Sequence, residues 1–275
     1  MAKSASQRIP NVLSIAGLDP SGGAGILADV KAMSALGAYG MAVTVALTAQ
    51  NTKAVTAVMP LPVDFVVKEI DTVFEDVRVD AVKIGMLGTP ELVEAVASAL
   101  TRWRPPIVVL DPVMVAKSGD RLLAEAAVKA FKERLLPLAD IVTPNLPEAE
   151  VLLGRTVKRR EQMPDAAAEL AALMKPGAAV LLKGGHLENT QSLTDVFYEN
   201  GRAVLFEGAF VRTRNTHGTG CTLSSALAAE LARGLPRIEA VRAALSYVRE
   251  AIVSADRLEV GGGHGPTHHF HAFFP

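Results

Sequence analysis

The sequence predicts an α/β fold, a three-layer sandwich in which helices cover both faces of a mostly parallel central sheet. The main observation is that short, nearly continuous apolar runs alternate with longer amphipathic stretches, as in parallel strands buried on both faces. Composition agrees, because 49% of the 275 residues are hydrophobic and 21% are charged, which suits a large core. No internal repeat or long linker divides the chain, so we expect one domain over residues 1–275.

Six apolar runs are predicted as buried strands because they are short and are followed by turn residues or amphipathic stretches. They cover residues 12–17, 41–47, 81–87 with its following turn, 106–112, 140–145 and 178–185. Residues 194–208 are expected to add a small hairpin at one edge of the sheet. Its turn is predicted at Asn200-Gly201, a pair typical of tight hairpins.

The amphipathic stretches between these runs are predicted as helices. They cover residues 25–37, 62–77, 89–103, 146–154, 219–234 and about 237–256. Residues 62–77 place one apolar set on one face, as in a helix that packs on a core: Val63, Val66, Val67, Ile70, Val73 and Phe74. The helix over 89–103 has Thr89 as its expected cap and Pro90 as its first residue.

Charge and cysteine content narrow the classes of function. A net charge of −1 indicates no basic surface for nucleic acid or an anionic membrane. A single cysteine excludes an intrachain disulfide and suits a reducing compartment. The N-terminus lacks the apolar core of a signal peptide, and no apolar run approaches the ~18 residues of a membrane span. We therefore expect a cytoplasmic protein that binds a small metabolite, with no nucleic acid and no membrane as partner.

The polar and glycine residues of interest gather after the predicted strands. They are Gly17 and Asp19, Gln50 and Asn51, residues 83–86, Asp111, Asn145 and residues 183–186. Parallel α/β sheets bind ligands beyond the carboxyl ends of their strands. This shared position predicts a site at that edge more strongly than any single motif does.

The stretch NTHGTGC, residues 215–221, is the most specific local pattern, because it places two glycines and the only cysteine where a helix begins. Thr216 or Thr219 could cap that helix. The glycines then let successive amides converge into an anion site at the positive end of the helix dipole. Cys221 is expected to have a lowered thiol pKa there. The plainer interpretation is a tight turn followed by a small buried cysteine.

A second glycine-rich stretch, residues 17–31, joins the first predicted strand to the first helix. Gly22, Gly23 and Gly25 permit close backbone approach to a ligand, or simply a flexible turn. Their spacing is not G-x-G-x-x-G, and the chain has no Gly-Lys pair, so a Walker A loop is absent. Asp29 could hydrogen-bond a substrate amine or face solvent.

Amide and acidic side chains at the other strand ends each allow two interpretations. Gln50 and Asn51 suit recognition of a planar heterocycle, or an ordinary polar loop. Asp111 could hold magnesium or open the next turn. Asn145 and Glu148 could order a magnesium shell or form a helix cap. Together, on adjacent strand ends, these residues favour a site for a metal and phosphates.

Lys183 and the C-terminal tail are less specific signals. Lys183 follows a predicted strand and suits phosphate, although a solvated lysine is the alternative. Residues 264–274 hold four of the six histidines and could bind a metal. With no cysteine or carboxylate nearby, we favour an ordered tail packed by Phe270 and Phe273.

These motifs together resemble the ribokinase-like vitamin kinases, and among them the hydroxymethylpyrimidine/phosphomethylpyrimidine kinases of thiamine biosynthesis. The resemblance runs nearly end to end. It is carried by SIAGLDPSGGAGILADVKAMSALGAYG, ALTAQNT, VKIGMLG, VLDPVMVAKSGD, TPNLPEAEVLLG, LLKGGH, NTHGTGCTLSSALAA and GPTHHFHAF. It implies a ribokinase-like fold and ATP-dependent phosphorylation of 4-amino-5-hydroxymethyl-2-methylpyrimidine and of its monophosphate. It also implies ATP and Mg²⁺ as cofactors and a homodimer.

The resemblance implies roles for individual residues. The pyrimidine pocket would use Gly17, Asp29, Thr48, Gln50, Met86 and Val113. Asp111 and Glu148 would handle magnesium, with Asn145 and Lys183 near the triphosphate. The catalytic set would be Lys183 with the anion hole of Gly218, Thr219, Gly220 and Cys221.

One departure from the wider superfamily concerns the catalytic base. Sugar kinases commonly carry an aspartate in a G-A-G-D version of the loop, where this chain has GTGC with Cys221 in the aspartate's place. Our hypothesis is that Cys221 accepts the substrate hydroxyl proton or aids positioning, since phosphoryl transfer is often loose. A pyridoxal kinase and a non-catalytic pyrimidine-binding regulator are the alternatives. Residues 51–58 and 115–123 are candidate lids.

Overall fold

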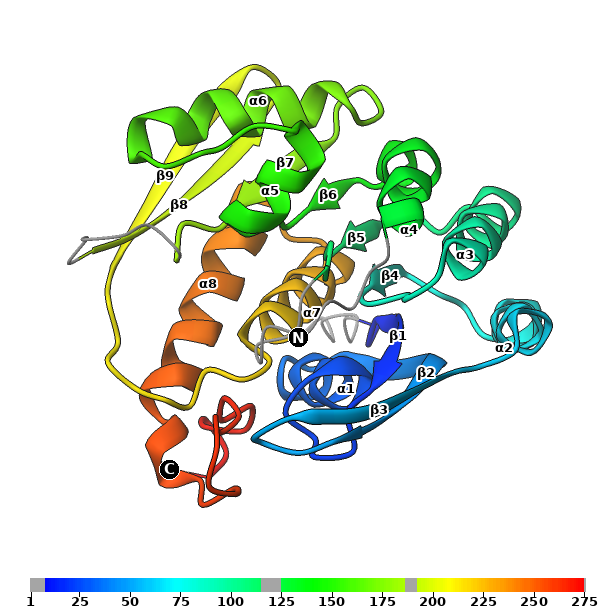
Figure 1. Ribbon diagram of the computed structural model, residues 1–275, viewed down its shortest axis with the longest axis horizontal. Coiled ribbons are helices and arrows are strands. Elements are labelled where there is room, and N and C mark those ends of the chain that lie inside the picture. The colour runs from blue at the N-terminus through cyan, green and yellow to red at the C-terminus, as the bar shows by residue number, and fades with distance from the viewer. Residues whose placement is uncertain (1–7, 115–124, 186–191, 275) are drawn as a thin grey trace, which may run out of the picture.

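The computed structural model describes residues 8–114, 125–185 and 192–274 (Figure 1). One nine-stranded sheet runs through the fold, in the order β3-β2-β1-β4-β5-β6-β7-β8-β9. The strands are β1 (Asn11–Leu18), β2 (Tyr39–Gln50), β3 (Val55–Pro60), β4 (Ala81–Ile84), β5 (Val108–Leu110), β6 (Ile141–Val142), β7 (Ala179–Leu182), β8 (Ser192–Glu199) and β9 (Arg202–Ala209). Since both halves of the chain supply strands to one sheet, we keep the prediction of a single domain over residues 1–275.

The centre of the sheet is parallel, as predicted. Strands β2, β1, β4, β5, β6 and β7 pair in parallel, whereas β3 and the β8–β9 pair are antiparallel to their neighbours. The predicted hairpin is β8–β9, and it turns at Asn200 and Gly201, whose φ angles are 50° and 78°. Positive φ at both positions is what this tight turn requires.

The edge beside β2 differs from the prediction. Residues 51–58 were expected to be a polar loop, but residues from Val55 onward form β3 and pair antiparallel with β2. Asn51 forms the turn between the two strands, since its Oδ1 accepts from the amides of Lys53 at 2.8 Å and Ala54 at 3.1 Å. Gln50 therefore lies at the end of a longer strand. The other candidate lid, residues 115–123, lies outside the described residues.

The helices follow the predicted order, with additions. They are α1 (Gly25–Ala35), α2 (Val63–Asp76), α3 (Pro90–Trp103), α4 (Glu125–Ala130), α5 (Leu146–Leu153), α6 (Met163–Ala172), α7 (Thr219–Ala232) and α8 (Arg237–Val253). Short helical turns η1 to η4 cover Phe131–Leu135, Leu136–Leu138, Arg160–Gln162 and Ala255–Arg257. Thr89 caps α3 as predicted, because its side chain accepts from the Leu92 amide at 3.3 Å. The helices α4 and α6 were not predicted from the sequence.

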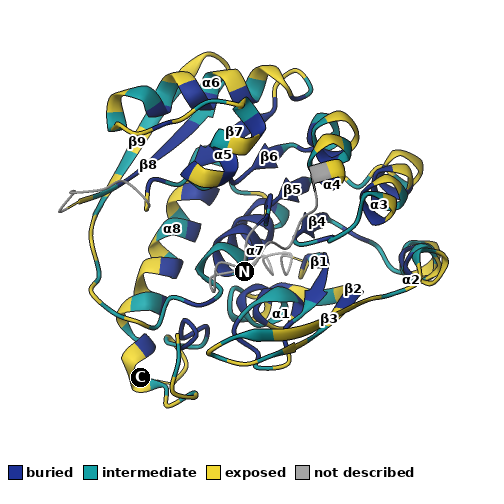
Figure 2. Ribbon diagram, in the orientation of Figure 1, coloured by how far each residue is buried: buried dark blue, intermediate teal, exposed yellow. Residues whose placement is uncertain are grey.

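Two hydrophobic cores lie on opposite faces of the sheet. One is shared with α2 to α6, and the other with α1, α7 and α8 (Figure 1). Successive strand residues alternate between them, so Val12 joins the second core and Leu13 the first. Figure 2 shows the buried residues along the central strands and the inner helix faces. No helix in the described part of the chain is both long and apolar enough to cross a membrane.

Candidate active site

Two glycine-rich loops meet at the carboxyl ends of the parallel strands, where α1 and α7 begin side by side (Figure 1). Gly218 has a φ of 76°, and a Cβ there would overlap the carbonyl oxygen of Gly23. Gly25 has a φ of 56°, and a Cβ there would overlap the carbonyl oxygen of Gly17. Gly218 is therefore required by close backbone approach between the two loops, and Gly25 by close approach within the first loop; both also adopt the left-handed conformation.

The N-terminus of α7 has no side-chain cap among the described residues. Its N-cap is Gly218, which carries no side chain, and the Thr219 hydroxyl donates to the Thr216 carbonyl at 2.8 Å. The predicted cap by Thr216 or Thr219 is therefore wrong, because the helix begins in a left-handed glycine. The amides of Gly220 and Cys221 lie in the first helical turn, where no helical carbonyl can accept from them. Together with the helix dipole, they form a site suited to an anion.

Cys221 is a neutral thiol rather than an activated one. Burial raises its pKa to about 11. The charge of Lys83 acts to lower the pKa, whereas the carboxylates of Asp29 and Asp111 raise it further. The Gly25 amide also donates to Cys221 and acts to lower the pKa. The predicted lowering of this pKa is wrong, because burial among charged neighbours outweighs the helix N-terminus.

Asp111 and Lys183 lie beside the start of α7. The buried Asp111 carboxylate accepts from Lys183 Nζ, Thr143 Oγ1 and Ser224 Oγ, each at 3.2 Å. A Cβ on Gly220 would be 3.4 Å from Lys183 Nζ and 3.6 Å from Asp111 Oδ2, so the ion pair borders the anion site. Burial acts to lower the pKa of Lys183, but the neighbouring carboxylates outweigh it, and the amine stays charged.

Asn145 and Glu148 form a capping box at the start of α5. Asn145 Oδ1 accepts from the Glu148 amide at 2.9 Å, and Glu148 Oε2 accepts from the Asn145 amide at 2.8 Å. Burial raises the pKa of Glu148 to about 7; Lys183 opposes this rise and Asp111 adds to it. Within the described residues, no three acidic, histidine or cysteine side chains gather as a ready-made metal site. The two hydrogen bonds confirm the predicted helix cap, and the pair's role toward magnesium stays a prediction.

Asp29 is placed differently from the expectation. It is fully buried, and its carboxylate accepts from Lys83 Nζ at 2.8 Å on both oxygens. Ser14 Oγ donates to Oδ2 at 2.6 Å and Ser225 Oγ to Oδ1 at 2.7 Å. Since all four approaches to the carboxylate come from the protein, Asp29 has no free acceptor for a substrate amine. It instead joins β1, β4, α1 and α7 beneath the site.

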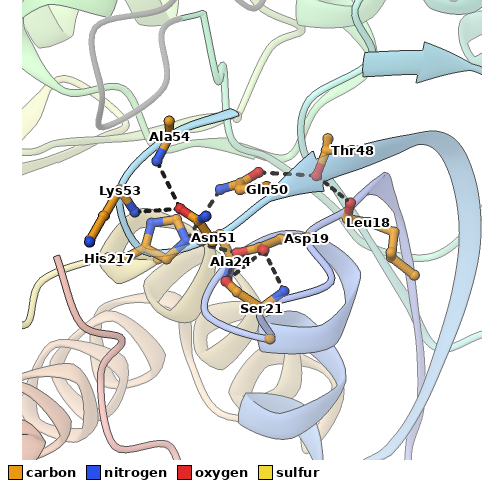
Figure 3. A network of polar contacts seen from close by, with 12 residues as sticks. Leu18, Asp19, Ser21, Ala24, Thr48, Gln50, Asn51, Lys53, Ala54 and His217 are labelled. Carbon is orange, nitrogen blue, oxygen red and sulfur yellow. Dashed lines mark hydrogen bonds and ion pairs between the residues drawn. The ribbon is translucent and has the colours of Figure 1, made fainter. Parts of the chain in front are cut away.

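The other predicted pocket residues lie at the same strand ends. Gly17 is close to Met86, whose terminal methyl group occupies the space that a side chain at Gly17 would need. The Thr48 hydroxyl is 3.0 Å from the Leu18 carbonyl oxygen and 3.2 Å from Gln50 Oε1 (Figure 3). Val113 lies two residues after Asp111, and its amide donates to the Asp111 carbonyl at 2.8 Å. Thr48 thus contacts the end of β1, Met86 lies against Gly17 in the same strand, and Val113 follows β5.

His217 and Asp19 are a pair to which the sequence analysis gave no role. His217 Nε2 lies 2.7 Å from Asp19 Oδ2 and 3.4 Å from Gln50 Nε2, so the loop before α7 contacts both strand ends (Figure 3). The only local signal was a histidine directly before the glycines and an aspartate directly after a strand. Their separation of 198 positions hides the contact from any local pattern.

The histidine-rich tail is ordered, as favoured. The ring of Phe270 contacts that of Phe273 at 6.2 Å between centroids, although Phe273 is 60% exposed. His269 Nε2 lies 3.1 Å from Thr222 Oγ1 on α7, and the Tyr247 hydroxyl on α8 donates to the His269 carbonyl at 2.7 Å. Burial lowers the pKa of His269 to about 3, so this ring is neutral and packs between the two helices.

Comparison with known proteins decides the family. The model of the phosphomethylpyrimidine kinase family matches residues 19–268. The chain belongs to this family. It is 52% identical to the hydroxymethylpyrimidine/phosphomethylpyrimidine kinase of Rhizobium meliloti, over 95% of this chain and 97% of that protein. It is 51% identical to the kinase of the same name from Escherichia coli, over 96% of this chain and 98% of that protein.

Solved structures agree with this phosphomethylpyrimidine kinase assignment. That of phosphomethylpyrimidine kinase from Clostridium difficile has a TM-score of 0.79 at 40% identity and covers 89% of this chain and all of its own. That of Staphylococcus aureus pyridoxal kinase with AMP-PCP and pyridoxal has a TM-score of 0.87 at 31% identity, over 97% of this chain and 96% of that chain. The predicted family and fold are confirmed, and the protein is a kinase.

Proposed function

We propose that this kinase uses ATP to phosphorylate 4-amino-5-hydroxymethyl-2-methylpyrimidine, and then its monophosphate to the diphosphate, in thiamine biosynthesis. The names of the relatives support this substrate class. The observation that carries the proposal is the uncapped start of α7, where the amides of Gly220 and Cys221 lie beside Lys183. Amides and a lysine at one point suit the charge that develops on a phosphoryl group in transfer.

On the phosphate side, we assign the anion hole to Gly218, Thr219, Gly220 and Cys221. Lys183 would move from Asp111 toward the transferring phosphate, since its amine stays charged. Mg²⁺ would be held by Asp111 and Glu148, with Asn145 near the triphosphate, and would neutralise phosphate charge. The residues fit a cation, because burial and the Asp111 carboxylate keep the pKa of Glu148 high, which a nearby cation would relieve.

On the pyrimidine side, we assign the flat ring to Gly17, Met86 and Val113, with Thr48 and Gln50 at its polar edge. A glycine beside a methionine leaves a flexible apolar wall, since Met86 can move aside for a ring. Cys221 would position the hydroxymethyl group rather than take its proton, because burial raises the pKa of the thiol. Asp29 would not contact the substrate; it would support the site by joining the strands and helices beneath it.

The direct test is ADP formation by purified protein with ATP and Mg²⁺. We expect turnover with the hydroxymethylpyrimidine and then with its monophosphate, and turnover about 10²–10³-fold slower with Lys183→Ala at the same concentration. No ADP with either pyrimidine would contradict the proposal and favour a non-catalytic pyrimidine-binding regulator.

A pyridoxal kinase is the second candidate. It is favoured by structural neighbours from Staphylococcus aureus and Bacillus subtilis, which are pyridoxal kinases with TM-scores of 0.87 to 0.88. Pyridoxal also presents a hydroxymethyl group on an aza-aromatic ring. If kcat/KM for pyridoxal exceeded that for the aminopyrimidine, our substrate assignment would be wrong. A homodimer and a cytoplasmic location stay predictions from the sequence.

A further inference from the structure

A buried network joins the loop after β1, the end of β2 and the loop before α7 (Figure 3). At its centre His217 Nε2 lies 2.7 Å from Asp19 Oδ2 and 3.4 Å from Gln50 Nε2. The imidazole has room because residue 23 is glycine, and any Cβ there would overlap the ring. The position of His217 is therefore built into both glycine-rich loops.

Asp19 determines which nitrogen of His217 carries a hydrogen. Its Oδ1 accepts from the Ser21 amide at 2.8 Å and the Ser21 hydroxyl at 2.7 Å, and its Oδ2 accepts from the Ala24 amide at 3.0 Å. Although burial acts to raise the pKa of Asp19, its hydrogen bonds with His217 and Ser21 lower the pKa, so the group is a carboxylate. A carboxylate only accepts hydrogen bonds, so His217 Nε2 must donate to Asp19.

This donor decides the orientation of the Gln50 amide. Nε2 carries one hydrogen, which it donates to Asp19. A glutamine nitrogen at 3.4 Å brings two donors together there, whereas a glutamine oxygen faces the positive N–H and can share its hydrogen. The oxygen and nitrogen of a glutamine exchange places on a half-turn. At 3.4 Å the contact is too long for a strong hydrogen bond. The electrostatic interaction still favours the Gln50 oxygen, rather than its nitrogen, toward the N–H of His217.

Thr48 supports the same orientation from the other side. Its hydroxyl has one hydrogen but lies within reach of two oxygens, at 3.0 Å from the Leu18 carbonyl and 3.2 Å from Gln50 Oε1. After the half-turn, the Gln50 nitrogen donates to the Thr48 hydroxyl, which donates to Leu18. Every donor then has an acceptor, and Gln50 keeps one oxygen lone pair and one N–H for a ligand.

We propose that His217, held by Asp19, is a positioning residue that sets ring specificity by fixing the Gln50 amide with its oxygen toward the imidazole. Gln50 then presents an acceptor beside a donor. This edge matches a ring that carries an amino group next to a ring nitrogen, and it repels the oxo form, in which a carbonyl lies next to a ring N–H. The inference rests on the proposed function and adds the reason for the choice of ring.

The test compares kcat and KM for the aminopyrimidine and its 4-oxo analogue at fixed ATP and Mg²⁺. For the wild type we expect kcat/KM to favour the amino ring by about 10⁴-fold, as in sites that leave a polar group unpaired with the wrong substrate. His217→Ala should reduce that ratio about tenfold, through KM for the amino ring, because the amide is then free to turn. His217→Gln, which can place an amide nitrogen near the position of Nε2, should restore part of the ratio.

Two further variants separate positioning from folding. His217→Phe fills the space of the imidazole but has no hydrogen-bond donor. It should reduce the kcat/KM preference for the amino ring as much as His217→Ala does, so the test can be made even if His217→Ala does not fold. His264→Ala, an exposed histidine of a neighbouring loop, should leave the ratio unchanged. Calorimetry of the binding of the two rings without ATP should rank the wild type and the variants in the same order of preference for the amino ring.

The outcomes distinguish this inference from the proposed function. If the wild type phosphorylates neither ring, the proposed function fails and the inference falls with it. If the wild type prefers the amino ring and folded His217→Phe keeps the full preference, only the inference fails. An equal loss of kcat on both rings would also overturn it, since that result indicates a purely structural role.

Discussion

Two lysine–aspartate pairs lie near Cys221, and they differ in how completely the protein surrounds them. In the first, Lys83 Nζ is 2.8 Å from both oxygens of Asp29, and both side chains are 0% exposed. In the second, Lys183 Nζ is 3.2 Å from one oxygen of Asp111, and the Lys183 side chain is 16% exposed. We call them the closed pair and the open pair.

The difference shows what separates a structural charge from one that can meet a ligand. Hydroxyls of Ser14 and Ser225 occupy the remaining acceptor positions on Asp29, so the closed pair has no free carboxylate acceptor for a ligand. Lys183 has a longer contact with its partner and borders the uncapped amides of α7. Both pairs join a lysine to an aspartate, so residue type does not separate them. Burial and the number of partners do, and so does position: Asp29 lies in α1 and Lys83 inside β4, whereas Asp111 and Lys183 directly follow β5 and β7.

The largest expected effect comes from breaking the closed pair. Asp29→Asn keeps the shape but leaves the Lys83 ammonium buried beside a neutral amide, which should reduce the free energy of unfolding by about 3–5 kcal/mol. Urea denaturation measures this loss. The double variant Asp29→Asn with Lys83→Met removes both charges and should regain part of the loss. An unchanged free energy of unfolding in the single variant would show that the closed pair is not structural.

Breaking the open pair should instead affect catalysis. Lys183→Ala removes a cation beside the anion site and should lower kcat by about 10²–10³-fold, the effect of losing one strong electrostatic contact in a transition state. Steady-state ADP formation measures it. Lys175→Ala is the matched control, because Lys175 pairs with Asp140 on the surface at 2.7 Å and should leave kcat unchanged. A kcat for Lys183→Ala within twofold of the wild type would show that the open pair, like the closed pair, has a structural role and no role in catalysis.

The open pair also predicts a pH dependence through Glu148. Burial raises the pKa of Glu148 in the folded state to about 7 from 4.5, so the native state holds a proton that the unfolded state has released between these pH values. The free energy of unfolding should therefore fall as pH rises through that window, by roughly 2–3 kcal/mol from this group.

Glu148→Gln checks the source of that slope, since glutamine can still form the capping box at Asn145. Denaturation between about pH 4.5 and 7 should show a flatter profile for Glu148→Gln than for the wild type. Parallel profiles would mean that Glu148 titrates at its ordinary pKa and that its burial does not matter.

The smallest expected effect is at Cys221, whose pKa is influenced by charges of both pairs. With a pKa of about 11 the thiol is protonated at neutral pH and cannot take a proton from the substrate. Cys221→Ala should therefore reduce kcat by no more than about tenfold, the range of a lost positioning contact. The pH dependence of kcat should have the same shape in Cys221→Ala as in the wild type. A loss of about 10³-fold would instead indicate a catalytic base.

The sequence predicted the residue ranges of the central strands and of most helices because their apolar patterns are local. It also placed the site at the strand ends, since that follows from a parallel sheet. It missed β3, whose residues are largely exposed at the edge, and the helices α4 and α6. Apart from the cap of α7, which fails for the local reason that Gly218 begins the helix, the failures within the site have a common cause: each depends on a residue distant in the chain.

Asp29 illustrates that cause most clearly. Its partner Lys83 is 54 positions away and Ser225 is 196 away, so no local pattern could show that its carboxylate is already satisfied. The pKa of Cys221 likewise depends on burial and on the charges of both pairs, which only the folded chain brings together. The contact of His217 with Asp19 has the same long-range origin.

The central claim is that the amides at the start of α7 receive the phosphate in transfer while the closed pair stays intact. The most direct measurement is a crystal structure with Mg²⁺, a non-hydrolysable ATP analogue and the aminopyrimidine. We predict terminal phosphate oxygens about 2.7–3.1 Å from the amides of Gly220 and Cys221, with Lys183 in contact and Asp29 still bound to Lys83. A terminal phosphate distant from residues 218–221, or an Asp29 that leaves Lys83 to bind the pyrimidine, would contradict this claim.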